Sequence, residues 1–199
     1  MISIVVPVYN GEKFIEKNFL SLVNQDNNTF EVIYINDGSI DNTAEKIEIL
    51  IKNYSNFRLI STPNSGVMAA RKQGVEVAKY DFVTFLDIDD VLDSNFVSVF
   101  LNYCKDNKFE ILVTNFRLNK NNNLKDIVRF QPGIYSSSDF IKYLCVNGGW
   151  ELCGKVYKKE LFDNIIYPNK VTIGEDALIF FQLVFYAYEI KVLNEYVYT

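Results

Sequence analysis

Over the first ninety residues, continuous apolar runs alternate with segments in which apolar residues recur at helical spacing. The runs are rich in β-branched and aromatic residues, as is typical of strands buried on both faces of a sheet. They cover residues 2–8, 30–36, 57–61 and 82–87. After the first run, Ile15, Phe19 and Leu22 fall on one helical face, which predicts an amphipathic helix. Two further helices are predicted over residues 41–54 and 67–78.

This alternation predicts an α/β fold, in which a mostly parallel, Rossmann-like sheet is flanked by helices on both faces. In such sheets, ligands bind beyond the carboxyl ends of the strands. A polar cluster follows each of the predicted strands, in turn Pro7, Tyr9 and Asn10; Asp37 and Gly38; Asn64 and Gly66; Asp87 and Asp89. One such cluster is an ordinary loop, but four at one edge predict a binding site.

From residue 97 onward the pattern is weaker. Helices are predicted over residues 96–107 and 173–187, and strands over residues 109–118 and 189–199. The segment NKNNNLKD, residues 119–126, is typical of a polar surface turn. QPGIYSSS predicts a loop that leads into a helix capped by Ser138 or Asp139.

Composition favours a globular chain of one domain, residues 1–199. Hydrophobic residues make up 49% of the sequence and charged residues 23%, which allows a substantial core. The net charge of -5 argues against a nucleic-acid partner, because such a partner normally meets a basic surface. The last residues, YVYT, have no polar tail, as is expected at the end of a truncated sequence.

The chain contains no histidine, which excludes Ser-His-Asp and Cys-His catalysis and every His-ligated metal site. Acid–base chemistry therefore falls to carboxylates, Lys or Tyr. Cys104, Cys145 and Cys153 are too few and too scattered for a disulfide framework, and they predict buried reduced thiols.

No signal peptide or transmembrane segment is predicted. The apolar start lacks a basic region and contains Pro7. The longest apolar stretch, residues 177–188, is interrupted by Gln182 and is shorter than the roughly 20 residues that a span needs. We therefore expect a cytoplasmic protein, and peripheral association with the inner face of the plasma membrane stays open.

Familiar phosphate-binding motifs do not explain the sequence. No G-x-G-x-x-G follows the first predicted strand, so a dinucleotide site is not expected. Residues 149–155 match G-x-x-x-x-G-K, but Val156 stands where a P-loop has Ser or Thr. We interpret this match as a coincidence.

The segment LDIDD, residues 86–90, is more informative. In an extended segment, Asp87 and Asp89 project to the same side and repel each other unless a cation or hydrogen bonds offset the charge. Mg²⁺ and Mn²⁺ prefer carboxylate oxygens and often share their ligand shell with substrate phosphates. The pair therefore predicts a metal or substrate site, with a helix-capping turn as the alternative. Asp93 or Ser94 fits that capping role.

Five motifs occur in the order and approximate spacing of the family 2 glycosyltransferases, namely VVPVYNG, VIYINDGSIDNT, TPNSGVMAARKQG, FVTFLDIDD and GEDALIF. The sequence thus resembles a bacterial, inverting member of that family with the GT-A fold, over nearly the whole chain. The resemblance implies a single catalytic domain. Residues 1–96 would be its nucleotide-sugar-binding half, and residues 97–199 its acceptor-side half.

The resemblance also implies roles for individual residues. Nucleotide-sugar binding falls to Pro7, Tyr9, Asn10, Asp37, Asn64, Gly66, Arg71 and Asp87, with an ordinary surface arginine of a helix as the alternative for Arg71. Within this set, Tyr9 would lie near the uracil ring, Asp37 would accept a hydrogen bond from the base, and Asp87 would contact the ribose. Asp89 would ligate a divalent cation, Mn²⁺ or Mg²⁺, and Asp90 would support this pair.

Three further roles concern the second half of the chain. In the motif that begins at Gly174, Asp176 resembles the catalytic base, with Glu175 beside it. A helix N-terminus stabilises a carboxylate at such a position. Trp150 would stack on a sugar or belong to the core. Lys155 would reach the diphosphate or the acceptor, or else remain solvated.

The implied reaction transfers a sugar from a nucleotide-sugar, expected to be UDP-linked, to a hydroxyl of a saccharide or lipid-linked saccharide acceptor in surface polysaccharide synthesis. The alternatives are a non-catalytic nucleotide-sugar-binding domain and a sugar nucleotidyltransferase, although the Gly- and Arg-rich loop of the latter is missing after the first strand. Some relatives complete the metal shell with a downstream histidine, which this chain lacks. We therefore expect weak metal binding without nucleotide.

Overall fold

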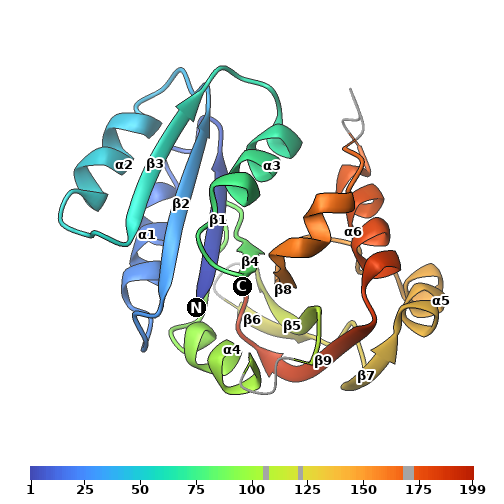
Figure 1. Cartoon of the computed structure of the whole chain (residues 1–199). Helices are drawn as coiled ribbons and strands as arrows, with labels where there is room; N and C mark the ends of the chain where they lie inside the picture. Colours follow the sequence, from blue (N-terminus) through green and yellow to red (C-terminus); the bar gives the residue numbers. More distant parts are fainter. Residues whose placement is uncertain (105–107, 121–122, 168–172) are drawn as a thin grey trace.

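The computed structural model describes residues 1–104, 108–120, 123–167 and 173–199, and its strands form one mixed sheet (Figure 1). The strands are β1 (Ile2–Val8), β2 (Phe30–Asp37), β3 (Phe57–Thr62), β4 (Phe82–Phe85), β5 (Ile111–Lys120), β6 (Asn123–Ile127), β7 (Gly133–Ser136), β8 (Lys155–Lys158) and β9 (Glu189–Tyr196). The helices are α1 (Ile15–Val23), α2 (Thr43–Ile51), α3 (Val67–Val77), α4 (Phe96–Cys104), α5 (Ser137–Asn147), the 3₁₀ helix η1 (Lys159–Asn164) and α6 (Glu175–Tyr186).

The sheet order is β3-β2-β1-β4-β8-β5-β9-β7, and β6 pairs with β5 outside this path. The first four strands of this order are all parallel, so their carboxyl ends share one edge. Next to them, β8 is antiparallel to both β4 and β5, whereas β5 and β9 are parallel. The predicted α/β sheet is therefore confirmed, and its parallel part is the part that the sequence pattern defined.

Two hydrophobic cores cover the two faces of the sheet because successive side chains of a strand point to opposite sides. On β1, Ile4 and Val6 belong to the core beneath α1, α2 and α4. Val5 belongs to the core beneath α3, α5, α6 and η1. Strands buried on both faces explain why the sequence shows continuous apolar runs rather than alternation.

Helix α3 lies close against β1. A Cβ added at Gly74 would be 2.2 Å from Val5 Cγ1, so only glycine permits this spacing without a shift of the neighbouring atoms. The small residues on the predicted third helix therefore serve close packing. This packing also fixes Arg71, one turn earlier on α3, relative to the carboxyl edge of the sheet.

Three local predictions are wrong. Part of the predicted turn at residues 119–126 is β6, whose residues are mostly exposed, so no apolar alternation marked it. Part of the predicted loop before α5 is the exposed strand β7. The cap of α5 is Ser136, whose side chain accepts a hydrogen bond from the Asp139 N–H, rather than Ser138 or Asp139.

Other predictions fall partly outside the described residues, namely the end of the helix predicted over residues 96–107 and the middle of the predicted turn, residues 121–122. The three cysteines are free thiols, but the prediction that they are buried is not met: Cys104 and Cys153 are partly buried and Cys145 is exposed. Within the described parts of the chain, no helix is both long and apolar enough to cross a membrane.

The end of the chain returns to the sheet beside β4 (Figure 1). The backbone of Thr199 exchanges two hydrogen bonds with Val91, and the Asp93 N–H donates to the carbonyl of Val197. This pairing fixes the loop that follows β4, which contains the aspartate cluster.

Candidate functional site

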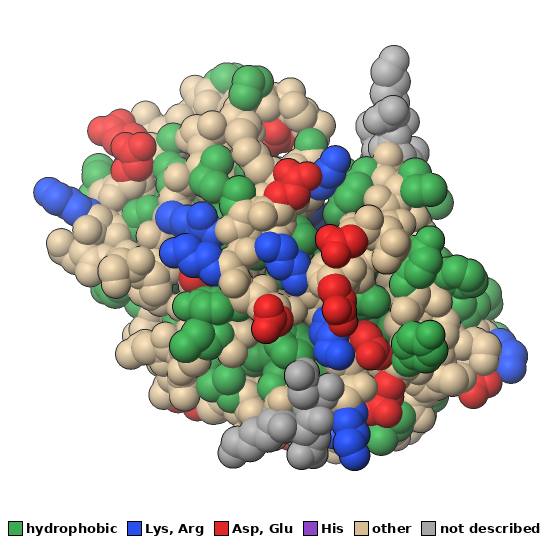
Figure 2. Space-filling model, viewed as in Figure 1, with side chains coloured by type: hydrophobic (Ala, Val, Ile, Leu, Met, Phe, Trp, Pro, Cys, Tyr) green, Lys and Arg blue, Asp and Glu red, His purple; other side chains and the backbone are tan. Residues whose placement is uncertain are grey.

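Two pockets meet at the loop after β4. The α3 pocket, of about 360 Å³, is lined by the sequence-predicted residues Pro7, Tyr9, Asp37, Arg71, Asp87, Asp89, Glu175 and Asp176. The β5 pocket, of about 460 Å³, shares Asp87 and Asp89 with it, and Asp90 and Lys155 also line it. Figure 2 shows acidic and basic side chains gathered along the middle of one face of the molecule.

Arg71 joins the two halves of the chain inside the α3 pocket. Its Nη2 lies 3.0 Å from Asp87 Oδ1, and its Nη1 lies 2.5 Å from Asp176 Oδ1. The guanidinium side chain is only 5% exposed. Desolvation by itself lowers the pKa of Arg71, but the neighbouring acidic groups, Asp87 and Asp176 among them, raise it above its ordinary value. A permanent cation therefore holds two predicted functional carboxylates side by side.

Asp176 is held through both of its carboxylate oxygens. Oδ1 accepts from Arg71, and Oδ2 accepts from the Leu152 N–H at 3.2 Å. The residue lies in the first turn of α6, where the helix dipole favours an anion. Arg71, the Leu152 N–H and the start of α6 together fix the direction in which the carboxylate faces the pocket.

Asp37 closes a loop. Its carboxylate accepts hydrogen bonds from the N–H groups of Ser65, at 2.7 Å, and Gly66, at 2.8 Å. The residue is 4% exposed although it lines the α3 pocket. Gly66 has a φ of 91°, a conformation that favours glycine. The clusters after β2 and β3 therefore meet, as their positions on a parallel sheet predicted.

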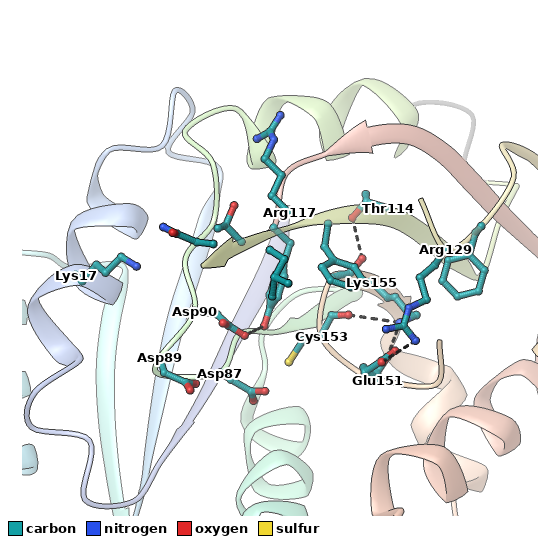
Figure 3. A pocket seen from close by; sticks show the side chains of 17 residues that line it. Lys17, Asp87, Asp89, Asp90, Thr114, Arg117, Arg129, Glu151, Cys153 and Lys155 are labelled. Carbon is teal, nitrogen blue, oxygen red and sulfur yellow. Dashed lines mark hydrogen bonds and ion pairs between the residues drawn. The ribbon is translucent and has the colours of Figure 1, made fainter. Parts of the chain in front are cut away.

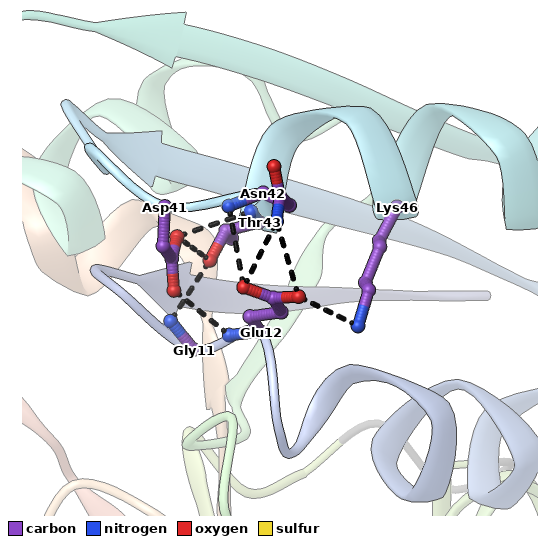
Figure 4. Close-up of polar contacts among 6 residues, drawn as sticks. All are labelled: Gly11, Glu12, Asp41, Asn42, Thr43 and Lys46. Carbon is purple, nitrogen blue, oxygen red and sulfur yellow. Dashed lines mark hydrogen bonds and ion pairs between the residues drawn. The ribbon is translucent and has the colours of Figure 1, made fainter.

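The loops after β1 and β2 are bonded to each other in the same way. The Asn10 side chain accepts from the Ile40 N–H, and the Gly11 N–H donates to Thr43 Oγ1, both at 2.9 Å. Glu12 accepts from Asn42 and pairs with Lys46 at 2.9 Å (Figure 4). Asn10 thus positions a loop wall and does not itself line either pocket.

The loop that contains the aspartate cluster rests on a buried asparagine. Asn18 Nδ2 donates to the carbonyls of Asp87 and Asp90, and Asn18 Oδ1 accepts from the Tyr34 hydroxyl. Asp90 accepts a hydrogen bond from the Tyr198 hydroxyl. Burial raises the pKa of Asp90 to about 6. Asp90 therefore lines the β5 pocket and is held by Tyr198.

The metal ligands that the chain itself supplies are few. Asp89 is exposed at the junction of the pockets, and Asp87 is half-buried beside it. Within the described residues, no group of three His, Cys, Asp or Glu side chains could hold a metal ion. This donor set fits a hard divalent ion that shares its shell with phosphate oxygens, and it does not fit a tightly held resident ion.

Lys155 is buried and Trp150 is partly exposed, so neither residue fully matches its sequence-based expectation. Lys155 is 4% exposed, so it is not a solvated surface lysine. Its Nζ donates to the carbonyl of Glu151 at 2.5 Å and lies 4.8 Å from the centre of the Phe180 ring. Trp150 packs against Phe181 and is 42% exposed, outside both pockets. Asn64 and Gly66 also lie outside both pockets, Gly66 bonded to Asp37 and Asn64 against Gly38.

Sequence reasoning missed several contributors to the site. Asn18 could have been found, because it falls on the apolar face of α1 together with Ile15 and Leu22, where an asparagine needs buried partners. Tyr198 and the backbone N–H of Leu152 had no such pattern. The β5 pocket adds Arg117 and Arg129, whose charges meet the site only through the fold (Figure 3).

Comparison with known proteins gives a consistent result. The model of the family described as Glycosyl transferase family 2 matches residues 3–166. An uncharacterized glycosyltransferase of Haemophilus influenzae is 31% identical over 85% of this chain and 66% of its own length. The uncharacterized glycosyltransferase EpsJ of Bacillus subtilis is 28% identical over 100% of this chain and 60% of its own length. The chain thus spans less than two thirds of these curated relatives.

Two solved structures have the same fold. S. aureus TarS 1-349 in complex with UDP-GlcNAc matches with a TM-score of 0.85 and 25% identity, covering 99% of this chain and 57% of that chain. The mannosyltransferase PcManGT from Pyrobaculum calidifontis, in complex with GDP-Man and Mn²⁺, matches with a TM-score of 0.71 and 16% identity, covering 98% and 55%. The second likeness concerns the fold alone.

Proposed function

The chain belongs to glycosyl transferase family 2, and on that premise we propose that it transfers a sugar from a nucleotide-sugar to an acceptor hydroxyl. The observation that carries this proposal is the joint placement of Asp87 and Asp176 on Arg71, beside Asp89. A donor-binding carboxylate, a base and a cation-binding carboxylate then face one pocket. The UDP-GlcNAc bound by TarS supports a UDP-linked donor.

Within this proposal, the α3 pocket receives the nucleotide. Tyr9 is 51% exposed and offers its ring to the uracil, and Asp87 reaches the ribose. Asp37 binds the base through lone pairs that Ser65 and Gly66 leave, so it also holds the pocket wall. Arg71 acts mainly on the two carboxylates and, through them, on the position of the donor.

Asp176 is the proposed base of a single displacement. Its carboxylate takes the proton of the acceptor hydroxyl as that oxygen forms a bond to the anomeric carbon. The bond between the anomeric carbon and the diphosphate oxygen breaks, the nucleoside diphosphate leaves with the electron pair, and the configuration inverts. The hydrogen bonds from Arg71 and Leu152 hold the carboxylate in place for this step.

Asp89, with Asp87 beside it, would hold Mn²⁺ or Mg²⁺ together with the diphosphate. The cation would supply positive charge against the leaving diphosphate. Asp90 supports the same loop through Tyr198.

The β5 pocket is the proposed site of the acceptor. We propose a hydroxyl of a saccharide or lipid-linked saccharide, because the β5 pocket adjoins Asp89 and takes most of its walls from residues 97–199. The whole of residues 1–199 would then act as one catalytic domain. The bacterial relatives are named as glycosyltransferases. On the family resemblance, we propose a role in surface polysaccharide synthesis, in the cytoplasm or at the inner face of the membrane.

A thermal-shift experiment tests the donor proposal. UDP with Mn²⁺ should raise the melting temperature of the wild type, and UDP or Mn²⁺ alone should raise it less, because ligands that bind the native state stabilise it. Asp89→Ala should lose the metal-dependent part of the shift. Asp163→Ala, at an acidic residue outside both pockets, is the control. If the wild type gives no metal-dependent shift with UDP, the donor assignment fails.

The base is tested separately by Asp176→Asn. We expect transfer to fall by about 10²–10⁴-fold, as for the loss of a general base. The thermal shift with UDP and Mn²⁺ should persist. Unchanged transfer in the variant would remove Asp176 from this role, and retained UDP binding without turnover in the wild type would favour a non-catalytic binding domain.

A further inference from the structure

We propose that Lys155 is a positioning residue, whose buried ammonium shapes the turn of residues 151–153 so that the Leu152 N–H holds Asp176. This inference rests on the proposed function insofar as Asp176 is the base. It assigns to Lys155 a role in orienting the base, in place of a direct contact with substrate.

The turn is built around two buried donors. Lys155 Nζ donates to the carbonyl of Glu151 at 2.5 Å and contacts the carbonyl of Cys153 at 3.5 Å. The Tyr157 hydroxyl donates to the carbonyl of Leu152 at 2.9 Å. With their carbonyls bound from within, residues 151–153 present the Leu152 N–H to Asp176 Oδ2 at 3.2 Å.

The burial of the Lys155 ammonium costs desolvation free energy, which a residue that only filled space would not need. Lys155 is 4% exposed and Tyr157 is fully buried. Among the described residues, no carboxylate lies within ion-pair distance of Lys155 Nζ, and its partners are carbonyls and the rings of Phe130 and Phe180. Burial lowers the pKa of Lys155 to about 8. An apolar side chain would avoid that desolvation cost.

The other charged groups around the turn complete this arrangement. Arg129 Nη1 pairs with Glu151 Oε1 at 3.2 Å, so the side chain of Glu151 is drawn outward while its carbonyl faces Lys155 (Figure 3). Asp176 and Glu151 favour the ammonium form of Lys155, and Arg129 opposes it. Lys155 therefore acts on Asp176 through the backbone, and the charge of Asp176 in turn favours the ammonium.

The first test needs no substrate. In protein labelled with ¹⁵N-leucine, the Leu152 amide should exchange with solvent at least about tenfold faster in Lys155→Met than in the wild type. Asp176→Asn should also change this amide. The control is Lys158→Met at the other end of β8, where the ammonium pairs with Glu110 and Glu160. Unchanged exchange in Lys155→Met would overturn the inference.

The second test uses kinetics with a UDP-sugar that the wild type turns over. Lys155→Met should lower kcat by about 10- to 100-fold, as expected for a displaced catalytic group, and leave the donor KM within about twofold. The donor KM should change little because residues 151–155 do not line the α3 pocket, where the donor nucleotide is proposed to bind. Tyr157→Phe, which loses the second anchor of the turn, should shift kcat in the same direction.

A double-mutant cycle tests the positioning role of Lys155 separately from the role of Asp176 as base. If Lys155 acts through Asp176, adding Lys155→Met to Asp176→Asn should cause no further loss of kcat. Additive losses would overturn the positioning role, as would a full kcat in Lys155→Met beside an inactive Asp176→Asn. Full activity of Asp176→Asn alone would refute the proposed base, and the amide exchange would still decide whether Lys155 holds the turn.

Discussion

At the scale of single residues, the site depends on carboxylates whose partners are already in place. Arg71 donates to Asp87 and Asp176, and the N–H groups of Ser65 and Gly66 donate to Asp37. Such donors orient a carboxylate before any ligand arrives, which reduces the cost of ordering it on binding. A residue that sequence resemblance assigns to the nucleotide can therefore act first on the protein.

For Arg71, we expect both Arg71→Gln and Arg71→Lys to lower the free energy of unfolding by about 1–3 kcal/mol, because each leaves a carboxylate short of a donor. Lysine does not reproduce the fork that reaches two acceptors. Transfer should fall in both variants. Chemical denaturation and donor turnover measure the two effects. Lys72→Gln is the matched control, since Lys72 is exposed on the next position of α3, and an Arg71→Lys variant equal to wild type would contradict this role.

For Asp37, we expect Asp37→Asn to lower the free energy of unfolding by about 1–3 kcal/mol. The two N–H groups bond to different carboxylate oxygens, and the amide replaces one of these acceptors with an NH2 donor. UDP affinity should fall together with stability. Asp41→Asn is unsuitable as a control because Asp41 bonds Thr43. Asp81→Asn is suitable, since Asp81 lies outside the α3 pocket. Wild-type stability with reduced UDP affinity would mean that Asp37 serves the ligand alone.

At the scale of elements, the site is placed by the contact of α3 with β1. Gly74 brings the helix against Val5, and Arg71 lies one turn away on the same helix. A wider spacing between helix and sheet would move the guanidinium away from Asp87, on the loop after β4. The small side chains of α3 thus connect a packing requirement to the geometry of the pocket.

Accordingly, Gly74→Ala should destabilise the protein by about 1–3 kcal/mol, the usual cost of overpacking, although alanine is the better helix former. Turnover should fall as well, because α3 must shift. Thermal unfolding and donor turnover give the two readings. Lys72→Ala, on the exposed face of α3, should change neither the stability nor the turnover. A stabilised Gly74→Ala variant would show that the interface relaxes freely.

At the scale of the whole molecule, residues distant in sequence meet in one place. Asp176 from α6 and Leu152 from the segment before β8 reach Arg71 on α3, and the last residues pair with the loop after β4. The two halves of the chain share one sheet through the pairing of β4 with β8. Stability and site geometry are therefore coupled across the molecule.

The buried ammonium of Lys155 gives a pH dependence of this global stability. Its pKa is about 8 in the native protein against 10.5 for an ordinary lysine, so between these two pH values the unfolded state binds more protons. Stability therefore rises with pH in this window. Compared with Lys155→Met, the wild type should gain unfolding free energy from pH 7.5 to pH 10, measured by urea denaturation. A pH-independent difference between the two proteins would contradict the burial of the charge.

By itself, the sequence determined the parallel part of the sheet and the polar clusters at its edge. Continuous apolar runs and helical spacing are local patterns, and the parallel order places the carboxyl ends together. The exposed strands β6 and β7 escaped prediction because nothing buries them on one face. The family resemblance supplied the candidate residues, and their roles stay predictions.

Only the tertiary structure decided what each side chain contacts. Hydrogen bonds between Arg71 and Asp176, or between Leu152 and Asp176, join residues that no periodicity relates. The burial of Lys155 likewise results from packing against Phe130 and Phe180, whereas in the sequence it is one lysine among neighbours that include Lys158 and Lys159. Local patterns report the burial of an element, but the partners of a polar group depend on where distant segments come to lie.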